Sequence, residues 1–364
     1  MPTKLVKRAL LLIAAVVALV VIAAAVPVPL WRTGETPLPE LHYLPAQRGA
    51  SKATRVWIDA DAACGTGKRR DPDDCLAQLS IASATNIHIV GISSVFGNAP
   101  VSETDRVMRA LVQELGSSAV RPLPVFTGCA AAGQKCLDDG GSLAAQRALR
   151  LALQAGALDC VALGPLTNLA AVLAQEPALA SRITRVIAVM GRRPGHRFHP
   201  SENRGVGAML FGHGPIFRDL NAVLDPQAVS VVLRSGISLI LVPYAAARQV
   251  SMTGSDLDAI AGLGPAGWWV AARSRDWLQF WQDEAGLQGF FPFDLVAAAY
   301  LRDPSRFRCA RVSAWVGDDA LLPWFSGGPA LLVAQPTGPP AAAHAVTGVL
   351  YCDAVTAKVS ELFQ

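Results

Sequence analysis

Acidic side chains gather near one point of the chain, where they could hold a cation. Asp59 and Asp61 end an apolar run, and Asp71, Asp73 and Asp74 follow soon after. Carboxylates brought together repel one another, so they need a cation, raised pKa values, or both. A set of ligands that are all oxygen atoms favours a hard ion, Ca²⁺ ahead of Mg²⁺. The EF-hand spacing is absent, so the chain must assemble this site from segments far apart in sequence.

The second acidic segment also suits an ordinary helix start. Asp71 can serve as the N-cap residue, Pro72 suits the first helical position, and the helix dipole favours Asp73 and Asp74. A structural role and a metal-binding role are therefore both open for this segment taken alone. The carboxylates that precede it favour metal binding.

These carboxylates need a scaffold, and the pattern after residue 52 supplies one. Short apolar runs alternate with helical segments, which is typical of a parallel sheet covered on both faces. We expect strands at Arg55–Asp61, Ile87–Gly97, Leu123–Gly128, Asp159–Gly164, Arg185–Gly191 and Ser238–Pro243. We expect helices at Asp73–Ala84, Ser102–Leu115, Ser142–Gln154, Asn168–Ala174 and Gln227–Ser235. No second break in composition follows, so residues 53–364 are predicted to form a single α/β domain with a doubly wound, mostly parallel sheet.

Ligands of such a sheet bind beyond the carboxyl ends of its strands. The residues at these ends include Asp59, Asp61, Asn98, Thr167, Asn168 and Met190. Because parallel strands end at the same edge, two carboxylates and two carboxamides are expected to converge there.

Taken in order, these motifs resemble the inosine-uridine-preferring nucleoside hydrolase family. That family opens with Asp-x-Asp-x-Gly-x-Asp-Asp, and the corresponding acids here look like Asp59, Asp61, Asp73 and Asp74. Further similar segments are Val95–Asn98, Gly164–Ala170, Val189–Gly191, Asp219–Asn221 with Asp225–Pro226, and Phe293–Ala297 with Asp303–Pro304. The resemblance spans roughly residues 55 to 305. Each segment is weak alone, but together they are a specific signal.

The resemblance implies hydrolysis of the N-glycosidic bond of a ribonucleoside, which releases base and ribose. It implies that Asp61, Asp74, Asp294 and the backbone carbonyl of Thr167 bind Ca²⁺, which also grips the ribose 2′- and 3′-hydroxyls. Asp61 would orient or deprotonate the attacking water. The residues implied to bind substrate are Asp59, Asp73, Asn98, Asn168, Met190, Asp219 and Asn221. Among them, Asp219 would lie near the 5′-hydroxyl, where the family usually has Glu.

The chain departs from the family pattern just after its first strand. Eleven residues, 62–72, separate Asp61 from Asp73, where the family has three. The inserted segment Cys64–Arg70 could form a basic flap over the site or an ordinary surface loop. It lacks the spacing of a phosphate-binding P-loop.

A second departure removes a proton donor. The family often has His immediately before its last Asp, where it can protonate the departing base, and here that position is Phe293. His199, His213 and Tyr244 are candidates for another donor. A substrate with a better leaving group would need less help, and so would a protein that binds the sugar without turnover.

Five aromatic residues lie within residues 268–281, a segment that we expect to be a helix. They are Trp268, Trp269, Trp277, Phe280 and Trp281. Trp277 and Trp281 share a helix face, which suits core packing. A lid that stacks on the base is the functional alternative.

The first fifty residues follow a different pattern. Residues 1–8 form a basic flank, residues 9–26 contain an apolar stretch just long enough to cross a bilayer, and residues 27–52 form a linker. The basic flank predicts that the catalytic domain lies on the non-cytoplasmic side, periplasmic or extracellular. The apolar stretch is either a membrane anchor or a signal segment that is cut on export.

Cysteine usage suits export. The pairs Cys64/Cys75, Cys129/Cys136 and Cys309/Cys352 are candidates for disulfides, with Cys160 left over. Ordinary buried thiols are the alternative, because spacing alone does not give connectivity.

Composition narrows the function classes. The 364 residues are 52% hydrophobic and 16% charged, which is too apolar for a disordered chain. The net charge of +4 is scattered, so no nucleic-acid partner is expected. A homo-oligomer is left open.

Three functional interpretations remain. The first is a Ca²⁺-dependent nucleoside hydrolase, and the second is a catalytically silent nucleoside or ribose receptor that keeps the metal site but has Phe293. The third is a phosphatase with Asp59 as nucleophile and Asp61 as acid, although a convincing later Lys and acidic pair are missing.

Overall fold

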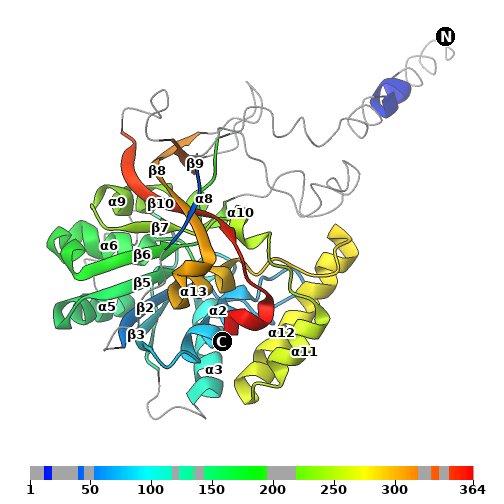
Figure 1. Ribbon diagram of the computed structural model, residues 1–364, viewed down its shortest axis with the longest axis horizontal. Helices are drawn as coiled ribbons and strands as arrows, with labels where there is room; N and C mark the ends of the chain where they lie inside the picture. The colour runs from blue at the N-terminus through cyan, green and yellow to red at the C-terminus, as the bar shows by residue number, and fades with distance from the viewer. Residues whose placement is uncertain are drawn as a thin grey trace, which may run out of the picture.

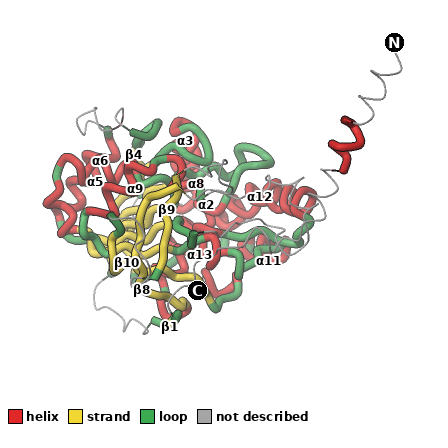
Figure 2. Tube along the Cα trace, turned by 90° about the horizontal axis from the view of Figure 1, so that it is seen from above, coloured by secondary structure: helices red, strands yellow, loops and turns green. Residues whose placement is uncertain are grey.

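A ten-stranded sheet with helices on both faces forms the centre of the computed structural model (Figure 1). The structure describes residues 12–18, 40–44, 53–116, 123–133, 136, 143–194, 219–318, 329–335 and 344–363. The strand order is β1-β8-β10-β7-β6-β5-β2-β3-β4, and β9 pairs with β8. Seen from above, the strands lie between the helical layers (Figure 2). The predicted single α/β domain with a mostly parallel sheet is confirmed.

The parallel part of the sheet contains the six predicted strands. They are β2 (Thr54–Ala60), β3 (Ile87–Ser94), β4 (Val125–Phe126), β5 (Leu158–Ala162), β6 (Ile183–Ala188) and β7 (Leu239–Leu241). Alternate side chains of β2 enter the two cores, with Val56 and Ile58 on one face and Trp57 on the other. Burial on both faces explains why these strands are apolar runs without alternation.

Helices cover both faces and are close to the predicted ranges. The predicted ones are α2 (Asp73–Ala82), α3 (Val101–Gly116), α5 (Ala144–Ala155), α6 (Thr167–Gln175) and α9 (Pro226–Arg234). The expected aromatic helix is α12 (Pro265–Phe280). The helices that were not predicted are α8 (Leu220–Leu224), α10 (Tyr244–Ala247), α11 (Gly254–Ala261) and α13 (Phe293–Arg302). Short turns of other helical types are η2 (Pro177–Arg182), η3 (Trp281–Ala285), η4 (Pro304–Arg306) and η5 (Val359–Phe363).

The C-terminal part of the sheet was not predicted from sequence. It consists of β8 (Phe307–Asp318), β9 (Pro329–Ala334) and β10 (Val346–Val355). β10 runs parallel to β7, whereas β8 is antiparallel to both β10 and β9. The strand β1 (His42–Tyr43) pairs antiparallel with β8, so the predicted linker 27–52 contains a short piece of the sheet.

The three predicted cysteine pairs form disulfides. Cys64–Cys75 joins the segment before α2 to that helix, and Cys129–Cys136 closes a short loop. Cys309–Cys352 links neighbouring strands β8 and β10 with a Cα–Cα distance of 4.0 Å. Cys160 is a buried free thiol.

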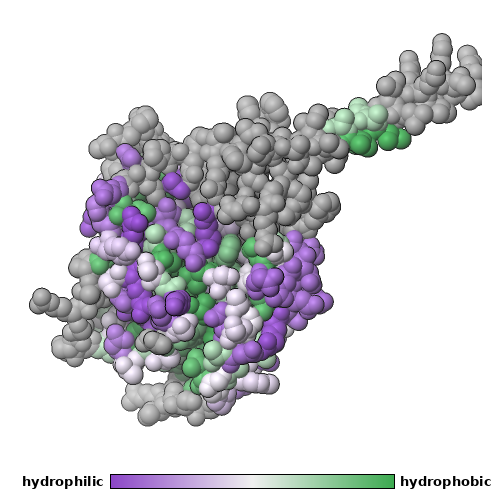
Figure 3. All heavy atoms as spheres, turned by 45° about the vertical axis from the view of Figure 1, so that its right-hand side comes forward, coloured by the Kyte–Doolittle hydropathy of each residue, from purple (hydrophilic) through white to green (hydrophobic). Residues whose placement is uncertain are grey.

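Only part of the predicted membrane segment is described. Residues 12–18 form a helix with exposed apolar side chains (Figure 3). Within the described ranges, no helix is both long and apolar enough to span a bilayer. The rest of residues 9–26 lies outside the described residues, as do His199 and His213.

Candidate functional site

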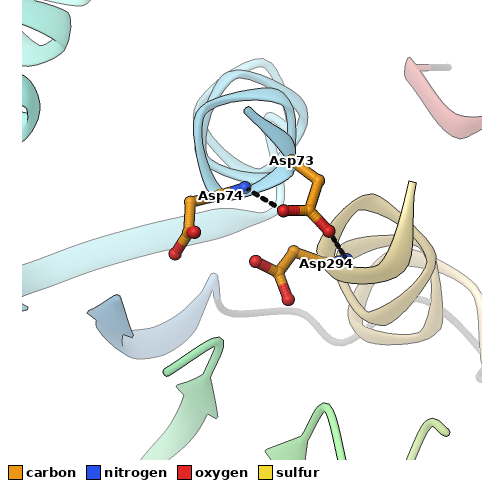
Figure 4. Close-up of side chains that lie close together, drawn as sticks. All are labelled: Asp73, Asp74 and Asp294. Atoms are coloured by element: carbon orange, nitrogen blue, oxygen red, sulfur yellow. Dashed lines mark hydrogen bonds between the residues drawn. The ribbon is translucent and has the colours of Figure 1, made fainter. Parts of the chain in front are cut away.

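The first turns of α2 and α13 bring three acids together (Figure 4). Asp73 and Asp74 begin α2, and Asp294 is the second residue of α13. All three are buried, and one carboxylate oxygen from each lies within 4.8 Å of the others. The segments are far apart in sequence, so the fold assembles the acidic site as the sequence predicted.

Asp73 ties the two helix starts to each other. Its Oδ1 accepts the backbone N–H of Asp74 at 3.1 Å, and its Oδ2 accepts the backbone N–H of Asp294 at 2.9 Å. Figure 4 shows these two bonds, with the Asp74 and Asp294 carboxylates on one side of the bridge. Both helix N-termini therefore face carboxylates, which their dipoles favour.

The preceding residues differ slightly from the expected helix cap. The helix begins at Asp73, so Pro72 occupies the N-cap position and not the first helical position. The Asp71 carboxylate still accepts the backbone N–H of Asp73, at 3.2 Å. Asp71 also lines the cavity described below, a position that its predicted capping role did not suggest.

Asp61 lies directly beside this cluster. Its backbone N–H donates to Asp74 Oδ1 at 3.1 Å. Its carboxylate accepts the backbone N–H of Asn98 at 2.7 Å and the Asn98 side-chain amide at 3.3 Å. A Cβ atom at position 97 would overlap this carboxylate, and one at position 164 would lie 3.2 Å from the Asp61 Cβ. Gly97 and Gly164 therefore allow the backbone to hold Asp61 in one orientation.

Asp59 and Asn168 form a supporting layer. Asp59 Oδ1 accepts hydrogen bonds from Ser93 Oγ at 2.7 Å and Asn168 Nδ2 at 2.8 Å. Asn168 also binds the backbone of Ser94 and Cys129. Both side chains are buried, and neither contributes to the cavity lining. Both were predicted to bind substrate, but the structure places them outside the cavity lining, where they are bonded to each other.

A cavity of about 480 Å³ is lined in part by Asp71, Asp73 and Asp294. The predicted site residues that line it are Asp73, Asn98, Met190, Asp219, Asn221 and Asp294. The Asp219 carboxylate accepts the backbone N–H of Gly191 at 2.7 Å. The Asn221 amide donates to the carbonyls of Leu163 and Val189, at 2.6 and 3.1 Å.

Thr167 lies elsewhere. Its hydroxyl donates to Asp225 Oδ2 at 2.7 Å, and it lines a second cavity with that residue. Leu163, at the end of β5, lines the acidic cavity instead. Sequence reasoning missed Leu163, although its place just before Gly164 at a strand end was an available signal.

Burial raises the pKa values of the acids. Desolvation raises the pKa of Asp59 and of Asp61 to about 7, against the lowering effect of their hydrogen-bond donors. Desolvation and then the neighbouring carboxylates raise the pKa values of Asp71, Asp74 and Asp294 well above the ordinary range. Asp59 Oδ2 is buried without a hydrogen-bond donor among the described residues. Buried acceptor oxygens in this number fit a divalent cation, which would favour their ionised forms.

Aromatic side chains form one wall of the cavity. Tyr244, Trp277 and Phe293 line it. The Tyr244 and Phe293 rings are stacked with centroids 5.8 Å apart, and Trp277 stacks on Phe280 at 5.2 Å. Trp277 is therefore both part of the core and part of the cavity wall, so core packing is confirmed and stacking on a base stays a prediction.

The inserted segment reaches the same cavity. Arg69 and Arg70 line it, as expected for the basic flap. Arg69 pairs with Glu284 at 3.3 Å and lies 5.3 Å over the Phe280 ring, while Arg70 donates to the backbone carbonyl of Asn98. The Cys64–Cys75 disulfide fixes the base of this segment.

The family model described as inosine-uridine preferring nucleoside hydrolase matches residues 56–324. The chain belongs to this family. As a nucleoside hydrolase, it hydrolyses the N-glycosidic bond of ribonucleosides, and the family depends on a divalent metal. Family membership replaces the phosphatase interpretation.

Known relatives agree in sequence and in fold. The pyrimidine-specific ribonucleoside hydrolase RihA of Salmonella typhimurium is 25% identical over 267 residues, covering 67% of this nucleoside hydrolase and 80% of the relative. RihA of Escherichia coli O7:K1 is 26% identical over 267 residues, covering 67% of this chain and 80% of the relative. The plant nucleoside hydrolase PpNRh1 superimposes with a TM-score of 0.63 at 18% identity, covering 86% of this chain and 97% of that chain. A purine-preferring ribonucleoside hydrolase from Gardnerella vaginalis gives 0.63 at 17%, covering 85% and 95%.

Proposed function

We propose that this nucleoside hydrolase uses Ca²⁺, held by Asp61, Asp74 and Asp294. The main support is the buried cluster of Asp73, Asp74 and Asp294, in which one carboxylate oxygen from each lies within 4.8 Å of the others. The backbone N–H of Asp61 donates to this cluster at Asp74. Ca²⁺ suits this set because it accepts many oxygen ligands in irregular geometry. When bound, the ion lowers the pKa of a water molecule and orients sugar hydroxyls.

A main-chain carbonyl would complete the ligand set. Thr167 is the predicted donor, but its hydroxyl is bonded to Asp225 at the second cavity. The Leu163 carbonyl instead accepts the side-chain amide of Asn221, which lines the acidic cavity. We therefore favour the Leu163 carbonyl over that of Thr167.

Asp61 is proposed as the base that takes a proton from the attacking water. Asn98 holds its carboxylate with two hydrogen bonds, so the acceptor oxygens have a defined direction. Breaking the C1′–N bond builds positive charge on the sugar ring, which the nearby carboxylates stabilise. Asp73, Asn98, Asp219 and Asn221 line the cavity and are proposed to bind sugar hydroxyls.

The test is a reducing-sugar assay with the full chain over purine, pyrimidine and nicotinamide nucleosides. We expect ribose release with Ca²⁺, loss of release with chelator, and loss in Asp61→Asn. Asp258→Asn is the matched control, because that carboxylate is exposed and pairs with Arg275. Binding without ribose release across the panel would instead support the silent receptor that Phe293 suggested.

We also propose that residues 9–26 anchor or export the enzyme, with the catalytic domain on the non-cytoplasmic side. The three disulfides support this proposal, because they persist in oxidising compartments. Protease treatment of intact cells should degrade an extracellular domain, and the same treatment of spheroplasts should reach a periplasmic one. Protection in both preparations would contradict the proposal.

A further inference from the structure

The cavity has a sugar end and a base end. The acids at the helix starts suit the sugar hydroxyls and the ion, so the base must extend toward the aromatic wall of Tyr244, Trp277 and Phe293. Stacking on such a wall favours a planar base. Phe293 cannot hydrogen-bond a departing base, so the reaction needs a polar partner from another element.

The inserted flap brings two cationic side chains to the same cavity. Its Arg69 is tied to the aromatic side, 5.3 Å over the Phe280 ring and 3.3 Å from Glu284. Its Arg70 is tied to the sugar side through the backbone carbonyl of Asn98. The flap therefore brings one guanidinium group to each side of the cavity, and that of Arg70 lies at Asn98, which also holds the carboxylate of Asp61.

We propose that Arg70 hydrogen-bonds the departing base and stabilises its negative charge. When the C1′–N bond breaks, its electron pair goes to the base, water adds to C1′, and the base later takes a proton from solvent. An Arg side chain stays protonated, so it assists by donating hydrogen bonds and not by giving up a proton. Arg70 has five N–H donors and uses one of them on the backbone carbonyl of Asn98. Arg69 is instead engaged by the Glu284 carboxylate and the Phe280 ring.

This inference rests on the proposed function. Bases that leave as anions and carry carbonyl acceptors, such as uracil and hypoxanthine, match a guanidinium group. The cationic nicotinamide base leaves as a neutral molecule, so it gains nothing from a nearby cation.

The test compares substrates that differ in their need for help. Uridine and inosine have poor leaving groups, whereas p-nitrophenyl β-D-ribofuranoside releases a stable phenolate. With Ca²⁺ present, Arg70→Gln should lower kcat for uridine or inosine by about 100-fold, as the loss of one transition-state donor does. It should leave kcat for the p-nitrophenyl riboside nearly unchanged. Lys68→Gln, an exposed change in the same flap, should alter neither.

Other outcomes would overturn the proposal. Equal losses on all substrates would mean that Arg70 acts on Asn98 and Asp61 as a positioning residue. Unchanged kcat values in Arg70→Gln would assign the leaving-group role to another residue. A loss of kcat for uridine or inosine that occurs only in Tyr244→Phe would assign it to Tyr244. An inactive wild-type enzyme on every substrate would refute the proposed function itself, and this inference with it.

Discussion

Removing the Cys64–Cys75 disulfide should weaken both the fold and the reaction. The two cysteines are 11 residues apart, and in the chain-entropy description closing such a loop stabilises the folded state by about 3 kcal/mol. The double change Cys64→Ala with Cys75→Ala should therefore lower the free energy of unfolding by about that amount. Because the disulfide fixes the flap, kcat for uridine should fall as Arg69 and Arg70 lose their positions.

The matched control is Cys309→Ala with Cys352→Ala. This pair is 43 residues apart and joins β8 to β10, so its loss should cost about 4 kcal/mol. Urea unfolding of the oxidised proteins gives the stabilities, and steady-state kinetics at a temperature where both variants are folded give kcat. Unchanged stability in the first variant would refute the loop argument. Equal losses of kcat in the two variants would refute the link between flap and site.

Three further changes test the site. Asp294→Asn should weaken Ca²⁺ binding by more than about 100-fold, which calorimetry can measure. Loss of an outer-shell partner lowers metal affinity by up to about 100-fold, and Asp294 is proposed to be a ligand itself. Burial raises the pKa of Asp219 to about 6, so its ionised form, and kcat/KM with it, should be lost as the pH falls through about 6. A pH profile of Asp219→Asn without that limb would agree, and an unchanged profile would not. Gly97→Ala should push a Cβ into the Asp61 carboxylate and lower kcat, and full activity would contradict the packing.

Much of the fold could be predicted because its signals are local. The strands from β2 to β7 are apolar runs between helical segments, a pattern that a buried parallel sheet requires. β8 and β10 pair through a register with two irregularities, and β10 then joins β7 from a distant part of the chain. Such pairing depends on where the rest of the sheet leaves an edge, which no local pattern contains.

The site divides in the same way. Asp59, Asp61, Asp73 and Asp74 were predictable because they occupy a strand end and a helix start, whereas Asp294 was implied only by the family resemblance. The bond from the backbone of Asp294 to Asp73 spans 221 residues of sequence, so it depends on how α2 meets α13. The hydrogen bond of Asn168 to Asp59 and the position of Leu163 in the cavity lining likewise follow from three-dimensional packing. The residue types alone did not reveal them.

The two departures from the family pattern meet in one cavity. α13 begins at Phe293, so the side chain at this position is held beside Asp294 whatever its chemistry. An aromatic residue there stacks on Tyr244, so position 293 itself offers the base no hydrogen-bond donor. Among the described residues that line the cavity, the cationic ones are Arg69 and Arg70, and both come from the insertion. The longer connection after β2 therefore brings hydrogen-bond donors to the same cavity in which position 293 has no donor.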